Sequence, residues 1–378
     1  MNPRPCSLIL AFALSSSLWG CGEPSPGGPV PLSKAALAAV SANPGAPRAD
    51  LARAVDTLFT DPAVGETRAI VVIATGQVAA ERYAPGYAPD TRFISWSMAK
   101  TITATMIGML IADGRLALDE PAPLPRWQRP GDPRAAITLR HLLQMRAGLD
   151  HTEAGDVPNE SSEVRMLFLD GRDDMARWAE EQPLEAEPGS KFEYSSNTTV
   201  ILADIAARVL TDNSQDPETR RKAVADYLHA RLFEPLGVNS VVPEFDAAGT
   251  LIGGSLMHAT ARDFARFGEF LRNEGSYRGT QLVPRSWIEA MVTPSPRSPQ
   301  YGLQTWLNRP VPESMGESPL FPDRAPHSLF AMIGHMGQYV LVSPSQRLTV
   351  VRLGHSDDAQ RVALMPKLAD LVDIYPAR

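Results

Sequence analysis

The sequence predicts an α/β fold of the α+β type, in which one antiparallel sheet is built from both ends of the chain. Two observations lead to this prediction. Apolar runs bounded by turn residues, typical of buried strands, occur over 69–83 and again over 338–353. The segments between them carry apolar residues at helical spacing. A sheet assembled from the two termini and flanked by helices, with a mostly helical second lobe inserted between them, accounts for this order.

The N-terminal strands form a hairpin. Residues 69–74 are apolar throughout, Thr75-Gly76 supplies a turn, and residues 77–83 return as the second strand. A short helical pattern over 51–59 precedes the hairpin. A longer helix is expected over 98–113, because its apolar residues fall on one face and a glycine follows it.

Further helices and a second pair of strands complete the predicted order. The helical stretches of the middle region lie at 137–145, 197–210 and 263–273. The C-terminal elements are strands over 338–342 and 348–353 and a helix over 358–374. The prolines concentrate in segments that we expect to be surface loops, at 121–133, 292–299 and 309–326.

Composition excludes some classes of function. The chain has 378 residues, of which 44% are apolar and 21% charged, as in ordinary globular proteins. The net charge of −7 comes from 36 basic and 43 acidic side chains that are scattered along the chain. Because there is no basic block, we expect no nucleic-acid partner.

The N-terminus is typical of an export signal. Arg4 precedes an apolar run over 8–18, which is shorter than the ~20 residues that a membrane-spanning helix needs. The run ends in Leu18-Trp19-Gly20-Cys21, which resembles the lipobox of a bacterial lipoprotein, with Cys21 as the lipidated residue. We therefore expect an exported protein of the bacterial cell envelope or periplasm, held at the membrane by a lipid anchor. The alternative is a plain secretory signal with an incidental cysteine.

This interpretation divides the chain into three parts. Residues 1–20 are the expected signal peptide, 21–48 the lipidated N-terminus with a Pro/Gly-rich tether, and 49–378 the folded domain. Cys6 and Cys21 are the two cysteines. The mature chain thus keeps at most one cysteine and forms no internal disulfide.

Ser97-Met98-Ala99-Lys100 is the strongest candidate for chemistry. A serine hydroxyl needs a base within hydrogen-bonding reach, and a spacing of three along a helix brings Lys100 over Ser97. The helix N-terminus favours negative charge that develops near the serine. Lys100 acts as a base only when neutral, so we expect its surroundings to lower its pKa. Taken alone, the tetrapeptide favours a helix cap with a solvated lysine, and it needs support from elsewhere in the sequence.

Two further motifs support a reactive centre. Tyr194, Ser196 and Asn197 lie together in a loop before a helix, where they can pass protons between nucleophile and leaving group. His335-Met336-Gly337-Gln338 precedes an apolar strand. There Gly337 lets the backbone approach a substrate, and the N–H of Gln338 is expected to pair with that of Ser97 as an oxyanion hole.

The order of these motifs resembles the serine β-lactamase and penicillin-binding-protein superfamily over about residues 60–375. The connecting segments are similar to the class C β-lactamase branch. Tyr194–Thr198 and Gly334–Gln338 are most similar to its 6-aminohexanoate-oligomer hydrolase-like and esterase members. The resemblance implies that Ser97 is acylated, Lys100 is its base, and Tyr194 protonates the leaving group and helps to activate water. It also aligns His335 and Gly337 with the lysine and glycine of the K-T-G element.

Two departures from the superfamily pattern bear on the substrate. Ser196 stands where an asparagine is usual, with Asn197 one place later. His335 replaces a lysine, and a histidine near its ordinary pKa of about 6.5 is mostly neutral at pH 7. The permanent charge for a substrate carboxylate is thus absent. We therefore expect weak or no β-lactamase activity, and an ester or a simple amide as substrate.

Other classes of enzyme lack their signatures here. The sequence contains no G-x-S-x-G elbow, no H-E-x-x-H or similar zinc motif, and no glycine-rich nucleotide-binding loop. We expect no metal and no organic cofactor. The sequence thus predicts a secreted serine hydrolase acting on a small ester or amide. The alternatives are a non-catalytic binding or sensing lipoprotein on the same fold, and a β-lactamase or D-peptidase.

Overall fold

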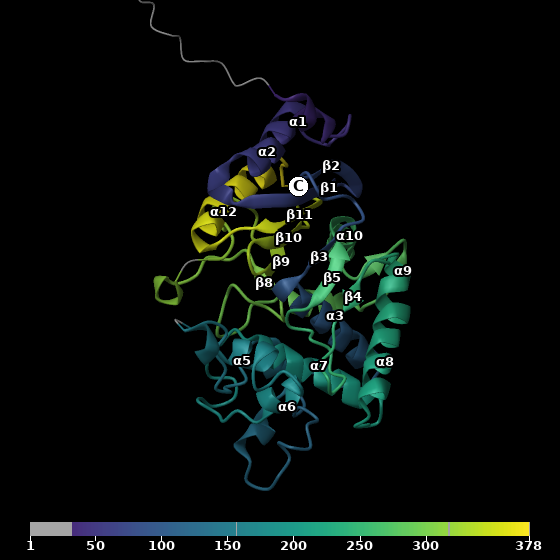
Figure 1. The fold of residues 1–378 in the computed structure, drawn as a ribbon, viewed down its shortest axis with the longest axis vertical. Helices are drawn as coiled ribbons and strands as arrows, with labels where there is room; N and C mark the ends of the chain where they lie inside the picture. Colours follow the sequence, from purple (N-terminus) through teal and green to yellow (C-terminus); the bar gives the residue numbers. More distant parts are fainter. Residues whose placement is uncertain (1–31, 156, 317, 378) are drawn as a thin grey trace, which may run out of the picture.

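The computed structural model describes residues 32–155, 157–316 and 318–377, and it is organised around a six-stranded antiparallel sheet. The strand order is β2-β1-β11-β10-β9-β8. Strands β1 and β2 come from the N-terminal part of the chain, and β1 pairs directly with β11 from the C-terminal part. The predicted sheet from both ends of the chain is confirmed (Figure 1).

The sheet consists of β1 Glu66–Ala74, β2 Gln77–Tyr83, β8 Trp306–Leu307, β9 Phe330–Gly334, β10 Gln338–Ser343 and β11 Leu348–His355. Smaller sheets use β3 Arg92–Ile94, β4 Val242–Pro243, β5 Met257–Thr260, β6 Ser276–Tyr277 and β7 Thr280–Gln281. The helices are α1 Lys34–Ala38, α2 Arg48–Thr60, α3 Ala99–Ala112, α4 Leu139–Leu143, α5 Ser162–Phe168, α6 Met175–Glu180, α7 Ser196–Leu210, α8 Pro217–Leu228, α9 Glu234–Leu236, α10 Ala261–Arg272, α11 Arg285–Met291 and α12 Asp358–Asp373.

Helices cover both faces of the large sheet. α2 and α12 pack together with α1 on one face, where they bury a separate apolar cluster against β1, β10 and β11. α10 packs on the opposite face against the same three strands. Alternate residues of β1 and β11 therefore enter two different cores, which explains why the central parts of both strands are buried on both sides and mainly apolar rather than alternating.

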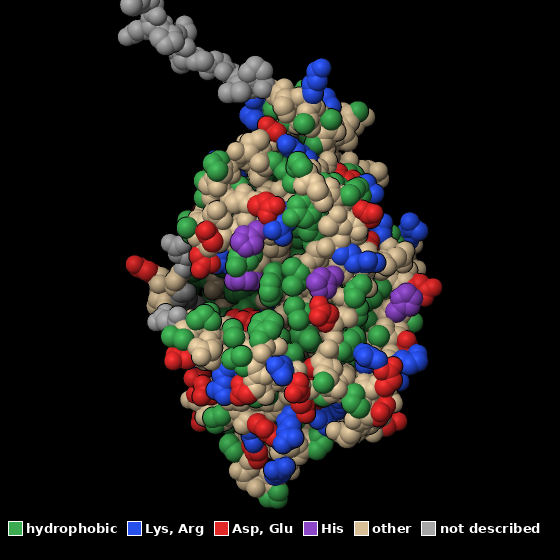
Figure 2. Space-filling view, in the orientation of Figure 1, with side chains coloured by type: hydrophobic (Ala, Val, Ile, Leu, Met, Phe, Trp, Pro, Cys, Tyr) green, Lys and Arg blue, Asp and Glu red, His purple; other side chains and the backbone are tan. Residues whose placement is uncertain are grey.

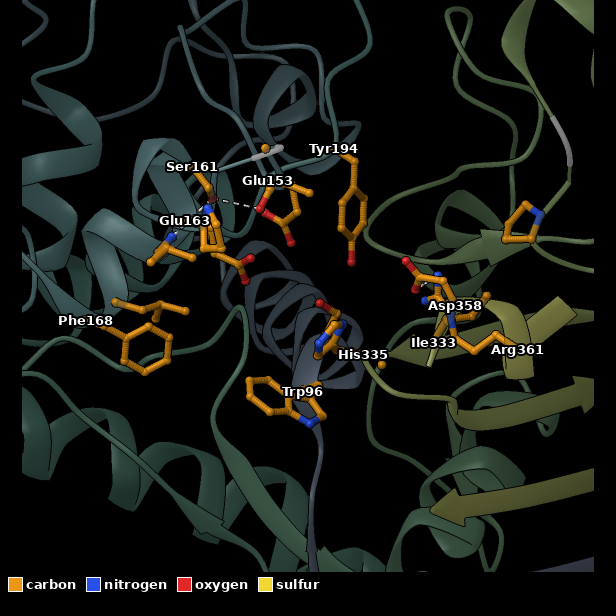
Figure 3. A pocket seen from close by; sticks show the side chains of 18 of the residues that line it. Trp96, Glu153, Ser161, Glu163, Phe168, Tyr194, Ile333, His335, Asp358 and Arg361 are labelled. Atoms are coloured by element: carbon orange, nitrogen blue, oxygen red, sulfur yellow. Dashed lines mark hydrogen bonds and ion pairs between the residues drawn. The ribbon is translucent and has the colours of Figure 1, made fainter. Parts of the chain in front are cut away.

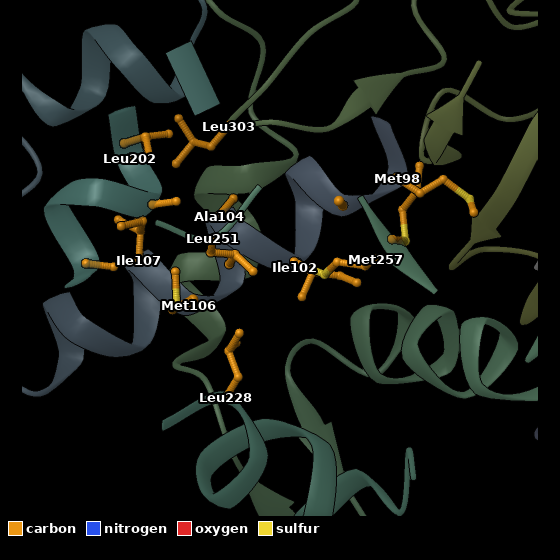
Figure 4. Packing of buried hydrophobic residues seen from close by; sticks show 14 of the residues in the cluster. Met98, Ile102, Ala104, Met106, Ile107, Leu202, Leu228, Leu251, Met257 and Leu303 are labelled. Carbon is orange, nitrogen blue, oxygen red and sulfur yellow. The ribbon is translucent and has the colours of Figure 1, made fainter. Parts of the chain in front are cut away.

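The second lobe is helical and is built around α3 and α7. Nearly every residue of α3 from its first turn to Leu110 is buried, and α3 packs against α7. Figure 4 shows Ile102, Met106 and Ile107 of α3 among apolar side chains of the surrounding segments. A helix buried on all sides holds its N-terminus rigidly, and that end of α3 points at the large sheet (Figure 1).

The packed part of the chain begins before residue 49, where we expected the domain to start. Ala36 and Val40 are buried against the first face of the sheet, and Val40 pairs with Ala80 of β2. Arg48 fastens this segment by donating to the carbonyls of Leu37, Val40 and Ser41. The predicted signal peptide and Cys21 lie outside the described residues. Within those residues, no helix is long and apolar enough to cross a membrane.

Candidate active site

Ser97 stands on a tight turn at the entrance to α3. The 3-10 turn Trp96–Met98 leads into the helix, and Trp96 has a φ of +44°, in the left-handed region that a tryptophan rarely adopts. The preceding Ser95 is fixed to β5 because its N–H donates to Met257 O at 2.7 Å and its hydroxyl accepts from Met257 N at 3.1 Å. The turn therefore places Ser97 at the helix N-terminus, where the helix dipole favours negative charge.

Lys100 lies one turn later and contacts Ser97 directly. Its Nζ donates to Ser97 Oγ at 2.9 Å, to Ser196 Oγ at 2.7 Å and to the carbonyl of Gly254 at 2.9 Å. The side chain is only 1% exposed. Gly254 is required for this arrangement, because a Cβ there would lie 2.9 Å from the carbonyl oxygen of Ser196. All three donors of an ammonium group are thus satisfied in a dry site.

The pKa of Lys100 differs from the expected direction. Burial lowers it, but the facing Tyr194 hydroxyl and the carboxylates of Glu153 and Glu163 outweigh burial, and the net pKa is raised above that of an ordinary lysine. The Nζ lies 3.5 Å from a carboxylate oxygen of Glu153. Lys100 is therefore held as an ammonium in the free protein. The expectation of a lowered pKa was wrong because Tyr194, and then these two carboxylates, act on the lysine from outside the motif.

Tyr194 faces the same lysine from the segment that leads into α7. Its ring centroid lies 4.8 Å from Lys100 Nζ, and the phenol interacts with Ser97 and Lys100. Tyr301 and Trp306 pack against the Tyr194 ring at centroid distances of 5.7 and 5.2 Å. Burial raises the pKa of Tyr194 despite the opposing charge of Lys100, so the hydroxyl carries its proton at neutral pH.

Ser196 and Asn197 have different environments. The Ser196 side chain is fully buried and its hydroxyl accepts the hydrogen bond from Lys100. The Asn197 amide turns away and donates to the carbonyl of Ser162, while its oxygen accepts from the Ser195 hydroxyl. The position that usually carries an amide in the superfamily thus presents a hydroxyl to the lysine, and the nearby amide fixes the start of α7 instead.

Two carboxylates meet at Ser196. Its hydroxyl lies 2.7 Å from Glu153 Oε1 and 2.9 Å from Glu163 Oε1, and its backbone N–H donates to Glu153 Oε2 at 2.5 Å. Glu163 is in the first turn of α5, and its N–H donates to the carbonyl of Thr152 at 3.1 Å. Burial and the charge of Glu153 raise the pKa of Glu163 to about 7.

His335 lies beside the nucleophile, in the turn after β9. Its ring makes an edge contact with Trp96 at a centroid distance of 5.4 Å. Gly334, one residue earlier, lets β9 approach the turn before Ser97, because a Cβ there would lie 2.4 Å from Ser95 O. Burial, and then the charge of Arg361, lower the pKa of His335. The imidazole is therefore neutral at pH 7, and the side chain supplies no fixed positive charge.

Gly337 and Gln338 are placed differently from the prediction. Met336 and Gly337, with φ of +57° and +80°, form the hairpin turn between β9 and β10. The buried Gln338 side chain donates to the carbonyls of His335, Met336 and Gly354, and its register partner is Gly334. Neither residue lines the cavity described next. The part of the hairpin that does so is the end of β9 with His335.

A cavity of about 600 Å³ opens over Ser97 between the two lobes. In Figure 3 the side chains of Tyr194, Trp96 and His335 surround its centre, with Glu153 and Glu163 on one side and Asp358 and Arg361 on the other. Figure 2 shows hydrophobic side chains gathered across the middle of this face, between the two lobes. The apolar part of the cavity wall comes from Ala154, Pro158, Val164, Leu167, Phe168, Trp306, Pro319 and Ile333.

The site therefore unites three motifs that are far apart in the sequence, and adds residues that sequence reasoning missed. Lys100 contacts Ser97, Ser196 and Tyr194, and His335 lines the same cavity as Ser97 and Tyr194. Glu153 and Glu163 were not predicted, because a glutamate in a loop and one in the first turn of the next helix carry no signal of pairing until the chain is folded. Among the described residues, no group of three or more histidine, cysteine or acidic side chains is arranged to hold a metal ion.

Comparison with known families identifies this arrangement. The family model described as Beta-lactamase matches residues 63–373, most of the chain. The chain belongs to the Beta-lactamase family. Its six-stranded sheet from both termini is therefore the fold of a family member, as the sequence resemblance implied.

Relatives of this family member indicate which branch it is close to. It is 27% identical over 239 residues to a 6-aminohexanoate-dimer hydrolase from Paenarthrobacter ureafaciens, covering 60% of this chain and 57% of the relative. It is 30% identical over 214 residues to the esterase EstB from Burkholderia gladioli, covering 50% and 51%. The chain thus spans between half and two thirds of these relatives. The structure of a family VIII carboxylesterase superposes with a TM-score of 0.62 at 15% identity, covering 86% of this chain and 96% of that one, which shows the shared fold.

Proposed function

We propose that this protein is a serine hydrolase that cleaves a small ester or amide through an acyl-enzyme on Ser97. The observation that carries the proposal is the contact of 2.9 Å between Ser97 Oγ and Lys100 Nζ under a cavity of about 600 Å³. The similarity to an esterase and to a 6-aminohexanoate-dimer hydrolase supports an ester or amide as the substrate. No metal or organic cofactor takes part in the proposed reaction.

The first half-reaction forms the acyl-enzyme. Ser97 Oγ attacks the substrate carbonyl while its proton passes to Lys100 in the neutral form. The oxyanion would be held by the N–H of Ser97 and a backbone N–H from the part of the β9 hairpin that lines the cavity, Ile333–His335. Tyr194 then gives its proton to the leaving alcohol or amine as the carbon–oxygen or carbon–nitrogen bond breaks, and Lys100 returns a proton to the phenolate.

The second half-reaction releases the acid. A water molecule attacks the acyl-enzyme carbonyl while its proton passes to the Tyr194–Lys100 pair, and the same pair returns a proton to Ser97 Oγ when the ester bond breaks. The raised pKa of Tyr194 suits this role, since the phenol carries a proton at the start of each turnover.

A fluorophosphonate probe tests the proposal, because it reacts with activated serine nucleophiles. We expect the wild-type protein to be labelled and to hydrolyse p-nitrophenyl acetate, and Ser97→Ala to lose both activities. Ser190→Ala is the matched control, since Ser190 is exposed and lies outside the cavity. If the wild-type protein is not labelled and hydrolyses no ester, the alternative of a binding or sensing protein on the same fold is correct.

Export and lipidation are separate proposals that rest on the sequence. Arg4, the apolar run over 8–18 and Cys21 support a signal peptide and a lipid anchor at the bacterial cell envelope. Metabolic labelling with a radioactive fatty acid tests the anchor. We expect label in the full-length protein and none in Cys21→Ser, whereas no label in the full-length protein would leave only the secretory signal.

A further inference from the structure

Glu153 and Glu163 form a pair of carboxyl groups that the mechanism above does not use. The loop that carries them is closed on itself by short-range bonds. The Ser161 hydroxyl donates to the carbonyl of Glu153 at 2.9 Å, and the Ser162 hydroxyl donates to that of Thr152 at 2.9 Å. These bonds hold the two carboxyl groups side by side against Ser196, where two negative charges repel each other.

Hydrogen-bond counting at Ser196 Oγ fixes how many protons the pair holds. A hydroxyl donates one hydrogen bond and accepts two. Lys100 Nζ donates to this oxygen at 2.7 Å, and the Ser196 proton serves one carboxylate. The Ser255 hydroxyl is a further donor at 3.4 Å, longer than an ordinary O–H···O bond, and it also bonds to Glu163. The second carboxyl oxygen lies no more than 2.9 Å away, so it serves the remaining lone pair with a proton of its own. With both groups ionised, one carboxylate oxygen would face a lone pair at hydrogen-bonding distance.

We propose that Glu153 and Glu163 share one proton across Ser196 Oγ, and that this proton sets the working state of Lys100 as a base. Because the remaining carboxylate takes the Ser196 proton, Ser196 accepts from Lys100 and cannot donate to it. Neutral Lys100 then donates its two hydrogen bonds to Ser196 Oγ and to the carbonyl of Gly254. Its lone pair is left facing Ser97 Oγ, where it can accept the hydroxyl proton. The inference rests on the proposed hydrolytic function and makes both glutamates positioning residues.

The shared proton also determines the pH at which the enzyme becomes active. The resting cluster is an ammonium on Lys100 with a singly protonated carboxyl pair. Loss of one proton yields either the fully ionised pair or neutral Lys100 beside a still-protonated pair. These two forms hold the same number of protons, so both appear at the same pH and in a fixed ratio. The second form is the active one.

Other charged groups around Glu163 are engaged elsewhere. Lys100 and Glu153 are the charges that act on its pKa, and the hydroxyls of Ser196 and Ser255 bond to it. Tyr194 interacts with the charges of Lys100 and Glu153, and His335 interacts with that of Glu153, rather than with Glu163. The charged groups on α5 itself and on the helices packed against it are exposed or form ion pairs away from the site, namely Glu160, Arg165, Arg177, Glu180, Asp204 and Arg208.

The pH profile of kcat/KM with p-nitrophenyl acetate tests this inference. In the wild-type enzyme we expect an ascending limb with an apparent pKa of about 7, the pKa of Glu163. In Glu163→Gln the pair has no proton to exchange, so the limb should move more than one pH unit higher, toward the raised pKa of Lys100. Glu153→Gln should shift the limb in the same direction. Glu160→Gln is the matched control, because Glu160 is exposed and should leave the limb in place.

The outcomes separate a positioning role from a structural one. A structural glutamate would change the height of the profile and leave the limb where it is, and that result in both Gln variants overturns the inference. Loss of activity at every pH, with native circular dichroism, also overturns it, because the charge rather than the shared proton would then be required.

Infrared spectroscopy tests the same pair without any turnover. In Ser97→Ala we expect a C=O stretch of a protonated carboxyl group that disappears as the pH rises through about 7 and that Glu163→Gln removes. The band of Glu180, whose pKa is raised to about 8, should remain in both proteins. If Ser97→Ala shows no band that Glu163→Gln removes, the inference is overturned whether or not the protein hydrolyses esters. Conversely, the band can be present in a protein without hydrolase activity, so the two proposals fail independently.

Discussion

Replacing Ser196 with alanine should damage both the stability and the reactivity of the site. The hydroxyl accepts from Lys100 at 2.7 Å and bridges Glu153 and Glu163 at 2.7 and 2.9 Å. Its removal leaves one donor of a buried ammonium unpaired in a site where Lys100 is 1% exposed. An unsatisfied buried polar group costs about 1–3 kcal/mol. We therefore expect Ser196→Ala to unfold at a lower urea concentration, with a loss of about 1–3 kcal/mol in the free energy of unfolding.

The same substitution should slow the reaction, because Lys100 loses the contact that orients it. If about 1.4–2.8 kcal/mol of this loss is felt in the transition state, kcat/KM for p-nitrophenyl acetate falls about 10- to 100-fold. Ser190→Ala, at an exposed serine, controls for the loss of a hydroxyl. The reasoning is refuted if Ser196→Ala keeps its kcat/KM within about twofold of the wild-type value and its unfolding midpoint is unchanged.

Three further substitutions give separate tests. Tyr194→Phe should lower kcat by about 10²–10⁴-fold with little change in KM, because the acid for the leaving group is lost while the ring packing is kept; an unchanged kcat would exclude this role. Burial, and then the charge of Asp204, raise the pKa of Glu180 to about 8, so the folded protein favours the protonated carboxyl group. The stability that this group contributes is fully present below the pKa of the unfolded state and is lost as the pH rises through about 8. Glu180→Gln should therefore become more stable relative to the wild type between pH 5 and pH 9, by roughly 1–3 kcal/mol, and equal urea midpoint differences at both values would contradict this. His335→Lys should raise nitrocefin turnover from a weak or undetectable level in the wild type by restoring a fixed positive charge, whereas wild-type turnover as fast as that of a true β-lactamase would refute the substrate argument.

The fold was predictable where local pattern and burial coincide. Strands β1, β2, β10 and β11 are apolar runs between clear turns, and their bounds lie within a few residues of the prediction. β9 was missed because it has only five residues and follows a proline-rich segment. α8 was missed for the opposite reason, since only Arg220, Val224 and Leu228 of its twelve residues are buried and the helix carries almost no apolar pattern.

The residues of the active site also differ in how far the sequence could predict them. Ser97 and Lys100 are visible in the sequence because one helical turn fixes their distance, and Tyr194 and His335 because the resemblance aligns them. Glu153 and Glu163 have no such support, since they lie ten positions apart and are brought together by the serines of the segment between them. They nonetheless affect the chemistry, because together with Tyr194 they raise the pKa of Lys100 against the effect of burial. A motif thus specifies which groups react, while the charges that the loops place around it determine the protonation state in which they do so.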